Sequence, residues 1–303
     1  MSVVRTADGS LVRRIDVPGA VHHVAVSPDG RFAVVTHPNE GGISAADLAS
    51  YEVTASISTG PLPNYAIFSP DGGRLYVSNA GNVTVSEVDT ARWIVLRNTL
   101  AGNSPEHMVL SHHGRRLYVA NVDDGTVSEV VTESGATLRT FDIGGPLHGL
   151  DLSKNGRTLF IRALGQDKLV AINLHSLEKR EAPLAPAPYH LASAGGTGKL
   201  YVSSAEQPNV WVVDQKDLVV LGKISIDAIE FNNAIACIDS FMAPLKRNSG
   251  VGSRPPPRPD ASPISRRPSS PLSYEDKVRL AATATASGAS DASSRCQVLV
   301  PLS

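Results

Sequence analysis

The sequence predicts an all-β fold, a β-propeller built from four-stranded antiparallel blades. Three observations lead to this prediction. A segment of about 42 residues recurs along most of the chain, most copies carry a tight-turn motif of the SPDG type, and each copy contains short apolar strands. Repeats of roughly 40–45 residues with four strands are typical of propeller blades, which bury their faces only by stacking against neighbours.

The repeat is anchored on a residue just before the turn. The anchors are Ser27, Ser69, Ser111, Ser153 and Ala194, spaced 42 residues apart and 41 for the last interval. Seven residues after each anchor comes an apolar or aromatic side chain: Val34, Tyr76, Tyr118, Phe160 and Tyr201. The alternative, a β-sandwich with accidental internal similarity, does not explain such constant spacing.

Each copy has the same elements in the same order. A short apolar strand, such as AIF before Ser69, comes first, and a turn written SPDG, SHHG or SKNG follows. Pro suits the second position of a type I turn, and Gly supplies the positive φ that ends it. A second strand runs through sequences such as LYV, a third through TVSEV at Thr84–Val88 and Thr126–Val130, and a fourth apolar segment closes the unit.

The repeats divide the chain into a propeller region, residues 1–227, and a tail, residues 228–303. The five blades are predicted at about 18–60, 61–103, 104–145, 146–186 and 187–227, with a half blade at 3–17. The tail lacks the repeat motif and is rich in Pro, Ser and Arg, which predicts a largely disordered segment. Because its length matches about two blades, we hypothesise an interrupted seven-bladed ring, with five full repeats and a partial N-terminal blade.

Composition excludes several classes of protein. Lys plus Arg number 28 against 29 Asp plus Glu, so no basic field predicts nucleic-acid binding. No apolar run is long enough to span a membrane. The two cysteines, Cys237 and Cys296, form no metal-binding or disulfide pattern. The N-terminus lacks the apolar core of a signal peptide, which predicts a cytoplasmic protein as the sequence is written, or a periplasmic or exported one if that end is incomplete.

Candidate ligand-binding residues gather where propeller topology predicts the channel face. The starts of the first strands carry His23, Asn64, His107, His148 and His190, and the loops after the second strands carry His37, Asn79, Asn121 and Arg162. A ring of imidazoles is suited to a divalent metal, a haem iron or an anionic ligand, and a metal would be held by His23, His107 and His190. The structural alternative is that these histidines only bind loop carbonyls. We expect no cofactor and assign no catalytic residue.

The motifs SPDG, LYVSN and TVSEVDT resemble the YVTN-type β-propeller repeat, over roughly residues 3–227. The chain is also similar to the propeller domain of cytochrome cd-type nitrite reductase and to lactonase-type propellers. The resemblance to the nitrite reductase propeller implies a histidine ligand to a d-type haem, but the CxxCH motif of a haem-c domain is absent. The resemblance to lactonase-type propellers implies a cluster of Glu, Arg and His side chains, which Glu106 and Arg162 match in part.

From these resemblances we expect a non-catalytic binding or scaffold protein that meets a small molecule or a protein partner on its channel face. A haem- or metal-dependent oxidoreductase and a lactonase-type hydrolase are the alternatives. One fold hosts many activities, so the repeat motif by itself does not choose among them.

Overall fold

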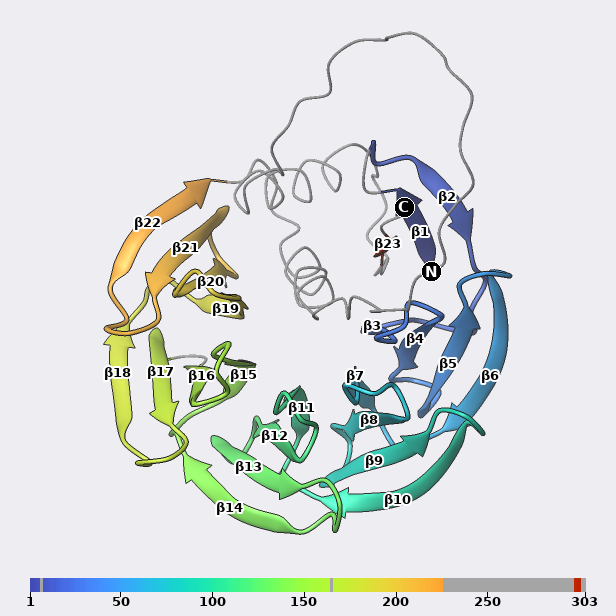
Figure 1. Cartoon of the computed structure of the whole chain (residues 1–303), viewed down its shortest axis with the longest axis horizontal. Coiled ribbons are helices and arrows are strands. Elements are labelled where there is room, and N and C mark those ends of the chain that lie inside the picture. Colours follow the sequence, from blue (N-terminus) through green and yellow to red (C-terminus); the bar gives the residue numbers. More distant parts are fainter. Residues whose placement is uncertain (6–7, 164–165, 226–296, 301–303) are drawn as a thin grey trace, which may run out of the picture.

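The computed structural model describes residues 1–5, 8–163, 166–225 and 297–300. In these residues five four-stranded antiparallel sheets stand side by side around a central axis, as the sequence predicts (Figure 1). The first strand of each sheet lies nearest the axis and the fourth lies at the outer rim. The prediction of an all-β propeller is therefore confirmed. The described segments contain no helix that is long and apolar enough to cross a membrane.

The blades follow the chain without exchange of strands. Blade 1 contains β3 (Val24–Val26), β4 (Phe32–His37), β5 (Gly42–Asp47) and β6 (Glu52–Ser58); blade 2 contains β7 (Pro63–Phe68), β8 (Arg74–Asn79), β9 (Thr84–Asp89) and β10 (Ile94–Leu100). Blade 3 contains β11 (Pro105–Leu110), β12 (Arg116–Asn121), β13 (Thr126–Val131) and β14 (Thr137–Asp142). Blade 4 contains β15 (Leu147–Leu152), β16 (Thr158–Ala163), β17 (Lys168–Asn173) and β18 (Lys179–Pro183); blade 5 contains β19 (Pro188–Ala194), β20 (Lys199–Ser204), β21 (Asn209–Asp214) and β22 (Val220–Ser225).

The N-terminal segment predicted as a half blade forms an antiparallel pair, β1 (Ser2–Arg5) with β2 (Leu11–Arg14). A third strand, β23 (Gln297–Val300), pairs with β1 in parallel orientation. This pairing differs from the antiparallel order of the other blades, and no strand is predicted there from the repeat. The rest of the predicted disordered tail, and with it the hypothesis of an interrupted ring, lies outside the described residues.

The turn between the first two strands of a blade is held by the anchor residue itself. In blade 1 the Ser27 hydroxyl donates to the Asp29 carboxylate at 2.6 Å and accepts from the Phe32 N–H at 2.9 Å. Gly30 follows with a φ of 73°, in the region that favours glycine. In blade 4 Ser153 and Asn155 make the corresponding hydrogen bond at 2.8 Å. The SPDG and SKNG sequences thus encode one turn with interchangeable Asp and Asn acceptors.

The turn between the third and fourth strands contains a left-handed backbone conformation that its residue types do not predict. A residue at or next to the end of this turn has a positive φ in all five blades, although only blade 3 uses glycine there. The residues are Tyr51 (φ 62°), Trp93 (53°), Gly135 (72°), Leu177 (63°) and Leu218 (62°). In blades 1 and 2 the preceding Asp47 and Asp89 carboxylates accept two backbone N–H groups of the turn. These bonds hold a backbone conformation that is costly for a bulky residue.

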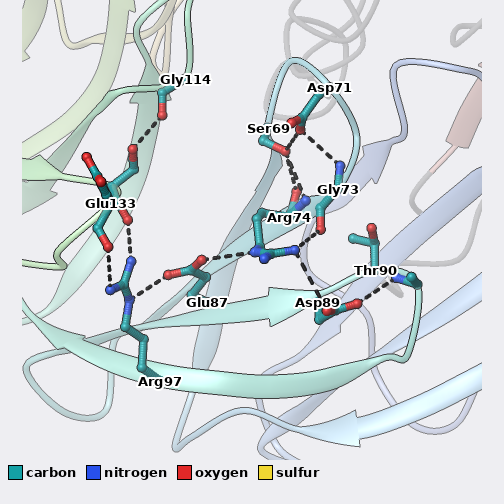
Figure 2. A network of polar contacts seen from close by, with 12 residues as sticks. Ser69, Asp71, Gly73, Arg74, Glu87, Asp89, Thr90, Arg97, Gly114 and Glu133 are labelled. Carbon is teal, nitrogen blue, oxygen red and sulfur yellow. Dashed lines mark hydrogen bonds and ion pairs between the residues drawn. The ribbon is translucent and has the colours of Figure 1, made fainter.

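Glutamates in the third strands of blades 2 and 3 are buried and paired with two arginines each. Glu87 lies 3.2 Å from Arg74 and 2.6 Å from Arg97, and its side chain is 9% exposed (Figure 2). Arg97 also donates to the carbonyl oxygens of Glu133, at 2.9 Å, and of Thr132, both in blade 3. In blade 2 the glutamate of TVSEV therefore pairs with Arg97, and Arg97 in turn bonds to the main chain of blade 3.

Candidate functional site

The first strands carry two rows of repeat-equivalent residues near the axis of the propeller. One row stands five residues before the anchor and is made of His22, Asn64, Glu106, His148 and Tyr189. The other stands four residues before and is made of His23, Tyr65, His107, Gly149 and His190. Both rows come from the innermost strands or from the residues that lead into them, which Figure 1 places around the axis. The constant repeat spacing places these residues at equivalent positions of successive blades.

The aromatic members of the two rows form a continuous cluster. The ring centroids of His23 and Tyr65 lie 3.8 Å apart, those of Tyr65 and His107 4.2 Å, and those of His107 and His190 5.8 Å. His148 then contacts Tyr189 at 4.4 Å and His190 at 4.7 Å. Four of the five histidines and asparagines predicted at the strand starts, His23, His107, His148 and His190, are therefore brought together. Asn64 lies on β7, and its carbonyl accepts hydrogen bonds from blade 1.

Two of these histidines use their Nδ1 atoms to join blades. The Nδ1 of His23 accepts the N–H of Ala66 at 3.3 Å, and the Nδ1 of His107 accepts the N–H of Leu150 at 3.3 Å. An accepting Nδ1 places the proton of a neutral imidazole on Nε2. Burial lowers the pKa of both rings to about 3, with smaller contributions from His22 and His190 at His23 and from His23 at His107. Both imidazoles are therefore neutral near pH 7.

The predicted metal triad does not fit this arrangement. With the proton on Nε2, the remaining nitrogen of His23 or His107 offers no lone pair to a cation. In the described residues no group of three or more His, Cys, Asp or Glu side chains is placed to hold a metal ion. The chemistry of the donor set thus disagrees with the triad His23, His107 and His190.

The residues predicted after the second strands lie inside the blades, with one exception. The Asn79 amide donates to the Thr84 and Ser86 hydroxyls, both at 3.0 Å, and Asn121 makes the same pair of bonds in blade 3. His37 binds the Ser44 hydroxyl through Nε2 at 2.8 Å. All three are buried, and each ties the second strand to the third. These contacts are structural ones with hydroxyls of the same blade, and not with the loop carbonyls that the structural alternative named.

Arg162 is the exception, because it reaches from blade 4 into blade 5. Its Nε–H donates to the Tyr189 carbonyl at 2.9 Å, and its guanidinium lies 5.2 Å from the centre of the Tyr189 ring. The side chain is fully buried, yet Nη1 and Nη2 have no hydrogen-bond partner in the described part of the chain. Burial lowers its pKa to about 10, against the opposing effects of Tyr189, Asp167 and Glu106. The guanidinium stays charged at neutral pH and keeps unused donors.

Glu106 and His148 lie beside this arginine on the channel side. The Glu106 Oε2 is 3.9 Å from the His148 Nε2, and the two side chains are 22% and 18% exposed. Burial, followed by Asp123, raises the pKa of Glu106, and Arg162 opposes this shift. Burial and the neighbouring His190 hold the pKa of His148 well below its usual value. The contact therefore joins a carboxylate to a neutral imidazole at more than hydrogen-bond length, so it is not a charged pair.

The sequence reasoning missed Tyr65, Tyr189 and Asp151. The tyrosines occupy the same two repeat positions as the histidines, and this alignment was the available signal. Asp151 is a carboxylate in an inner strand whose equivalents in blades 1 to 3 are apolar. It accepts the N–H groups of Ser193 and of Leu152, and burial raises its pKa to about 6. It links blade 4 to blade 5 on the same strand as His148.

Comparison with known proteins agrees with this architecture. A family model described as "Lactonase, 7-bladed beta-propeller" matches residues 32–212, more than half of the chain. A solved structure of hydrazine synthase from Kuenenia stuttgartiensis is similar, with a TM-score of 0.64 and 17% sequence identity, over 71% of this chain and 76% of the other. At that identity the likeness shows the fold alone. No curated protein matches the sequence. On the strength of the family match, the chain belongs to the lactonase family of seven-bladed β-propellers.

Proposed function

We propose that the channel face binds a small lactone and opens its ring by hydrolysis. The observation that carries this proposal is the grouping of Glu106, His148 and Arg162 from two neighbouring blades. Hydrolysis of an ester ring needs a base for the attacking water and positive charge where the carbonyl oxygen becomes an anion. A carboxylate with a raised pKa and a buried guanidinium with unused donors supply these two functions.

Each residue then has a defined role. Glu106 accepts a proton as water adds to the lactone carbonyl, and Arg162 stabilises the resulting oxyanion through Nη1 and Nη2. The ring C–O bond breaks as the tetrahedral intermediate collapses, and the departing alkoxide takes the proton back from Glu106. The product is an open-chain hydroxy acid. His148, neutral in this environment, accepts hydrogen bonds from substrate or water.

A binding module without turnover is the second candidate function. It is favoured by the aromatic cluster around His23, Tyr65 and His107, a set of packed rings with no catalytic group of its own. Such a protein would retain a ligand on the channel face and leave it unchanged. The two candidates differ in a single measurable property, which is the release of acid from a bound lactone.

The test measures proton release from δ-valerolactone and glucono-δ-lactone in weak buffer, with the uncatalysed rate subtracted. Glu106→Gln is expected to lower kcat/KM by roughly 10²–10⁴-fold, since it removes the general base. Arg162→Lys should cost roughly 10²–10³-fold, because an ammonium replaces the two-pronged donor. Glu178→Gln, at an exposed site on the turn before β18, is the matched control and should leave the rate unchanged.

The pH profile adds an independent readout. Because the pKa of Glu106 is raised, the rising limb of kcat/KM is expected above the ordinary glutamic acid value of about 4.3. Wild-type rates in both Glu106→Gln and Arg162→Lys would end the hydrolase proposal. Lactone binding by calorimetry without any acid release would favour the binding module instead.

A further inference from the structure

Four buried nitrogen atoms of blades 4 and 5 have no hydrogen-bond partner in the described residues. They are Nη1 and Nη2 of Arg162 and the Nδ1 atoms of His148 and His190. Histidines in the same rows of other blades differ, because the Nδ1 atoms of His23 and His107 accept main-chain N–H groups. A buried polar atom that stays unpaired costs free energy, so four of them in one place indicate a missing partner.

The ring of Tyr189 brings these side chains together. Its centroid lies 4.4 Å from that of His148 and 4.6 Å from that of His190, and the guanidinium carbon of Arg162 lies 5.2 Å away. The two imidazole centroids are 4.7 Å apart. Burial and neighbouring histidines lower the pKa of both imidazoles, and the charge of Arg162 adds to this shift. The four nitrogens therefore form one cluster, contributed by β15, β16 and β19.

Arg162 is a buried charge without a counter-ion. Its side chain is fully buried, and it forms no ion pair with a carboxylate of the described residues. Asp167 and Glu106 act on it only through longer-range attraction, and the Asp167 Oδ1 already accepts the Ala187 N–H at 2.7 Å. A buried charge that lacks a partner of opposite charge is strongly unfavourable.

The chemistry of the cluster selects the kind of partner. A guanidinium can only donate hydrogen bonds, and a neutral imidazole can carry its single N–H on Nδ1. The positive charge of Arg162 disfavours a cation, and a water molecule would accept hydrogen bonds but leave the charge uncompensated. An anion answers both needs through charge-assisted hydrogen bonds. Because the four nitrogens are shielded from solvent, the anion that requires least room, a halide, is favoured.

We infer that Arg162, His148 and His190 form a binding site for a small monovalent anion, chloride, in the resting protein. Nη1 and Nη2 of Arg162 and the Nδ1–H groups of the two imidazoles donate to the ion, which thereby joins blade 4 to blade 5. The site goes beyond lactone hydrolysis, because it is filled when no lactone is present. A lactone carbonyl oxygen would displace the ion from the same Arg162 donors.

The experiment compares thermal unfolding of the full chain in about 1 mM and about 100 mM chloride, with methanesulfonate keeping the ionic strength constant. The wild-type Tm is expected to rise by roughly 2–4 °C, since a ligand that binds only the folded state stabilises it by mass action. Arg162→Met should show no chloride-dependent rise. Arg157→Met, at an exposed arginine of the same blade, is the matched control and should keep the wild-type rise. No rise in the wild type, or equal rises in the wild type and Arg162→Met, would overturn the inference.

Two further variants test the imidazoles. His148→Phe and His190→Phe each keep a ring and remove Nδ1, so the chloride-dependent rise in Tm should fall by at least about half in each. The readout is the difference between two chloride concentrations, so a change in the Tm of the variant itself does not affect it. An undiminished rise in both variants would refute the assigned ligands. Bromide in place of chloride locates the ion by anomalous diffraction, with the peak expected beside the Arg162 guanidinium.

This test is separate from that of lactone hydrolysis, because it contains no lactone. A protein that binds chloride but releases no acid from a lactone keeps the anion site and loses the hydrolase, and the reverse result does the opposite. Where both hold, chloride should raise the KM for lactone and leave kcat unchanged, since the two compete for the Arg162 donors. A KM that does not depend on chloride in an active enzyme would contradict the assigned position.

Discussion

Replacement of Arg162 by methionine separates a functional arginine from a structural one. Methionine keeps an unbranched chain of similar length and removes the charge. Loss of an arginine with a structural role lowers the free energy of unfolding. Loss of an arginine that serves a ligand leaves the free energy of unfolding almost unchanged, because its buried donors have no partner in the folded protein. Because Nη1 and Nη2 are buried without a partner in the described residues, we expect Arg162→Met to abolish lactone hydrolysis and to leave stability almost unchanged.

The magnitude follows from the contacts. Each buried nitrogen without a partner costs about 1–3 kcal/mol, so the loss of Nη1 and Nη2 contributes about 2–6 kcal/mol in favour of the variant. The variant gives up the bond from Nε–H to the Tyr189 carbonyl, worth about 1.5–3 kcal/mol, and the contact with the Tyr189 ring, worth about 0.5–2 kcal/mol. The two sides nearly cancel. The free energy of unfolding should therefore change by less than about 2 kcal/mol.

The repeat offers a matched control at the equivalent position of blade 1. Thr36 is also fully buried, but its hydroxyl is satisfied, since it donates to the Asn64 carbonyl and accepts the His23 N–H, both at 3.0 Å. Thr36→Val should destabilise by about 1–3 kcal/mol, because it leaves the His23 N–H without this acceptor and removes one of the two hydrogen bonds to the Asn64 carbonyl. Urea unfolding followed by tryptophan fluorescence measures both variants. Destabilisation of Arg162→Met by about 3–5 kcal/mol, as expected for a broken structural charge pair, would refute the reasoning.

Two further predictions concern stability. The folded pKa of His107, about 3, lies below the unfolded value of 6.5, so its contribution is complete above pH 6.5 and is lost as the pH falls toward 3. Between pH 6.5 and 5.5 the wild-type free energy of unfolding should fall by about 1 kcal/mol more than that of His107→Gln, and equal pH dependence in urea titrations would contradict this. Glu87→Ala should destabilise by about 1–3 kcal/mol, less than a fully buried pair because Arg74 and Arg97 are 41% and 33% exposed and regain water. The control is Glu52→Ala at an exposed site, whose free energy of unfolding should stay within about 0.5 kcal/mol of wild type. Equal losses of stability in the two variants would show that the ion pairs of Glu87 do not stabilise the fold.

Local chemistry explains why the blades were predictable. The SPDG turn needs only residues within five positions of each other, as the bonds of Ser27 to Asp29 and Phe32 show. The alternation of strands and turns repeats with a fixed period, and a blade that cannot bury its faces alone must stack. The ring of histidines was predictable for the same reason, because equivalent positions in equivalent blades face the same axis.

Residue type does not predict the role of a polar side chain that can either bind a ligand or form a hydrogen bond within its own blade. Asn79, Asn121 and His37 stand at strand ends where propeller topology predicts a channel ligand, but each finds a hydroxyl seven residues further along in its own blade. Such a cross-strand bond is visible only once the register of the second and third strands is known. The positive φ of Trp93 was also not predictable from residue type, because an aromatic side chain gives no indication of a left-handed backbone.

The amino-acid sequence alone determined the repeat, the turns, the order of strands and the row positions of His23, His107, His148 and His190, because these depend on contacts within one blade and on a constant period. Tertiary structure decided which polar groups are used up and which are left over. The Nδ1 atoms of His23 and His107 are occupied by the next blade, while the guanidinium of Arg162 is buried beside Glu106 and His148 with donors to spare. Whether a polar atom is satisfied depends on the neighbouring blade, which lies about 40 residues away in sequence and in direct contact in space.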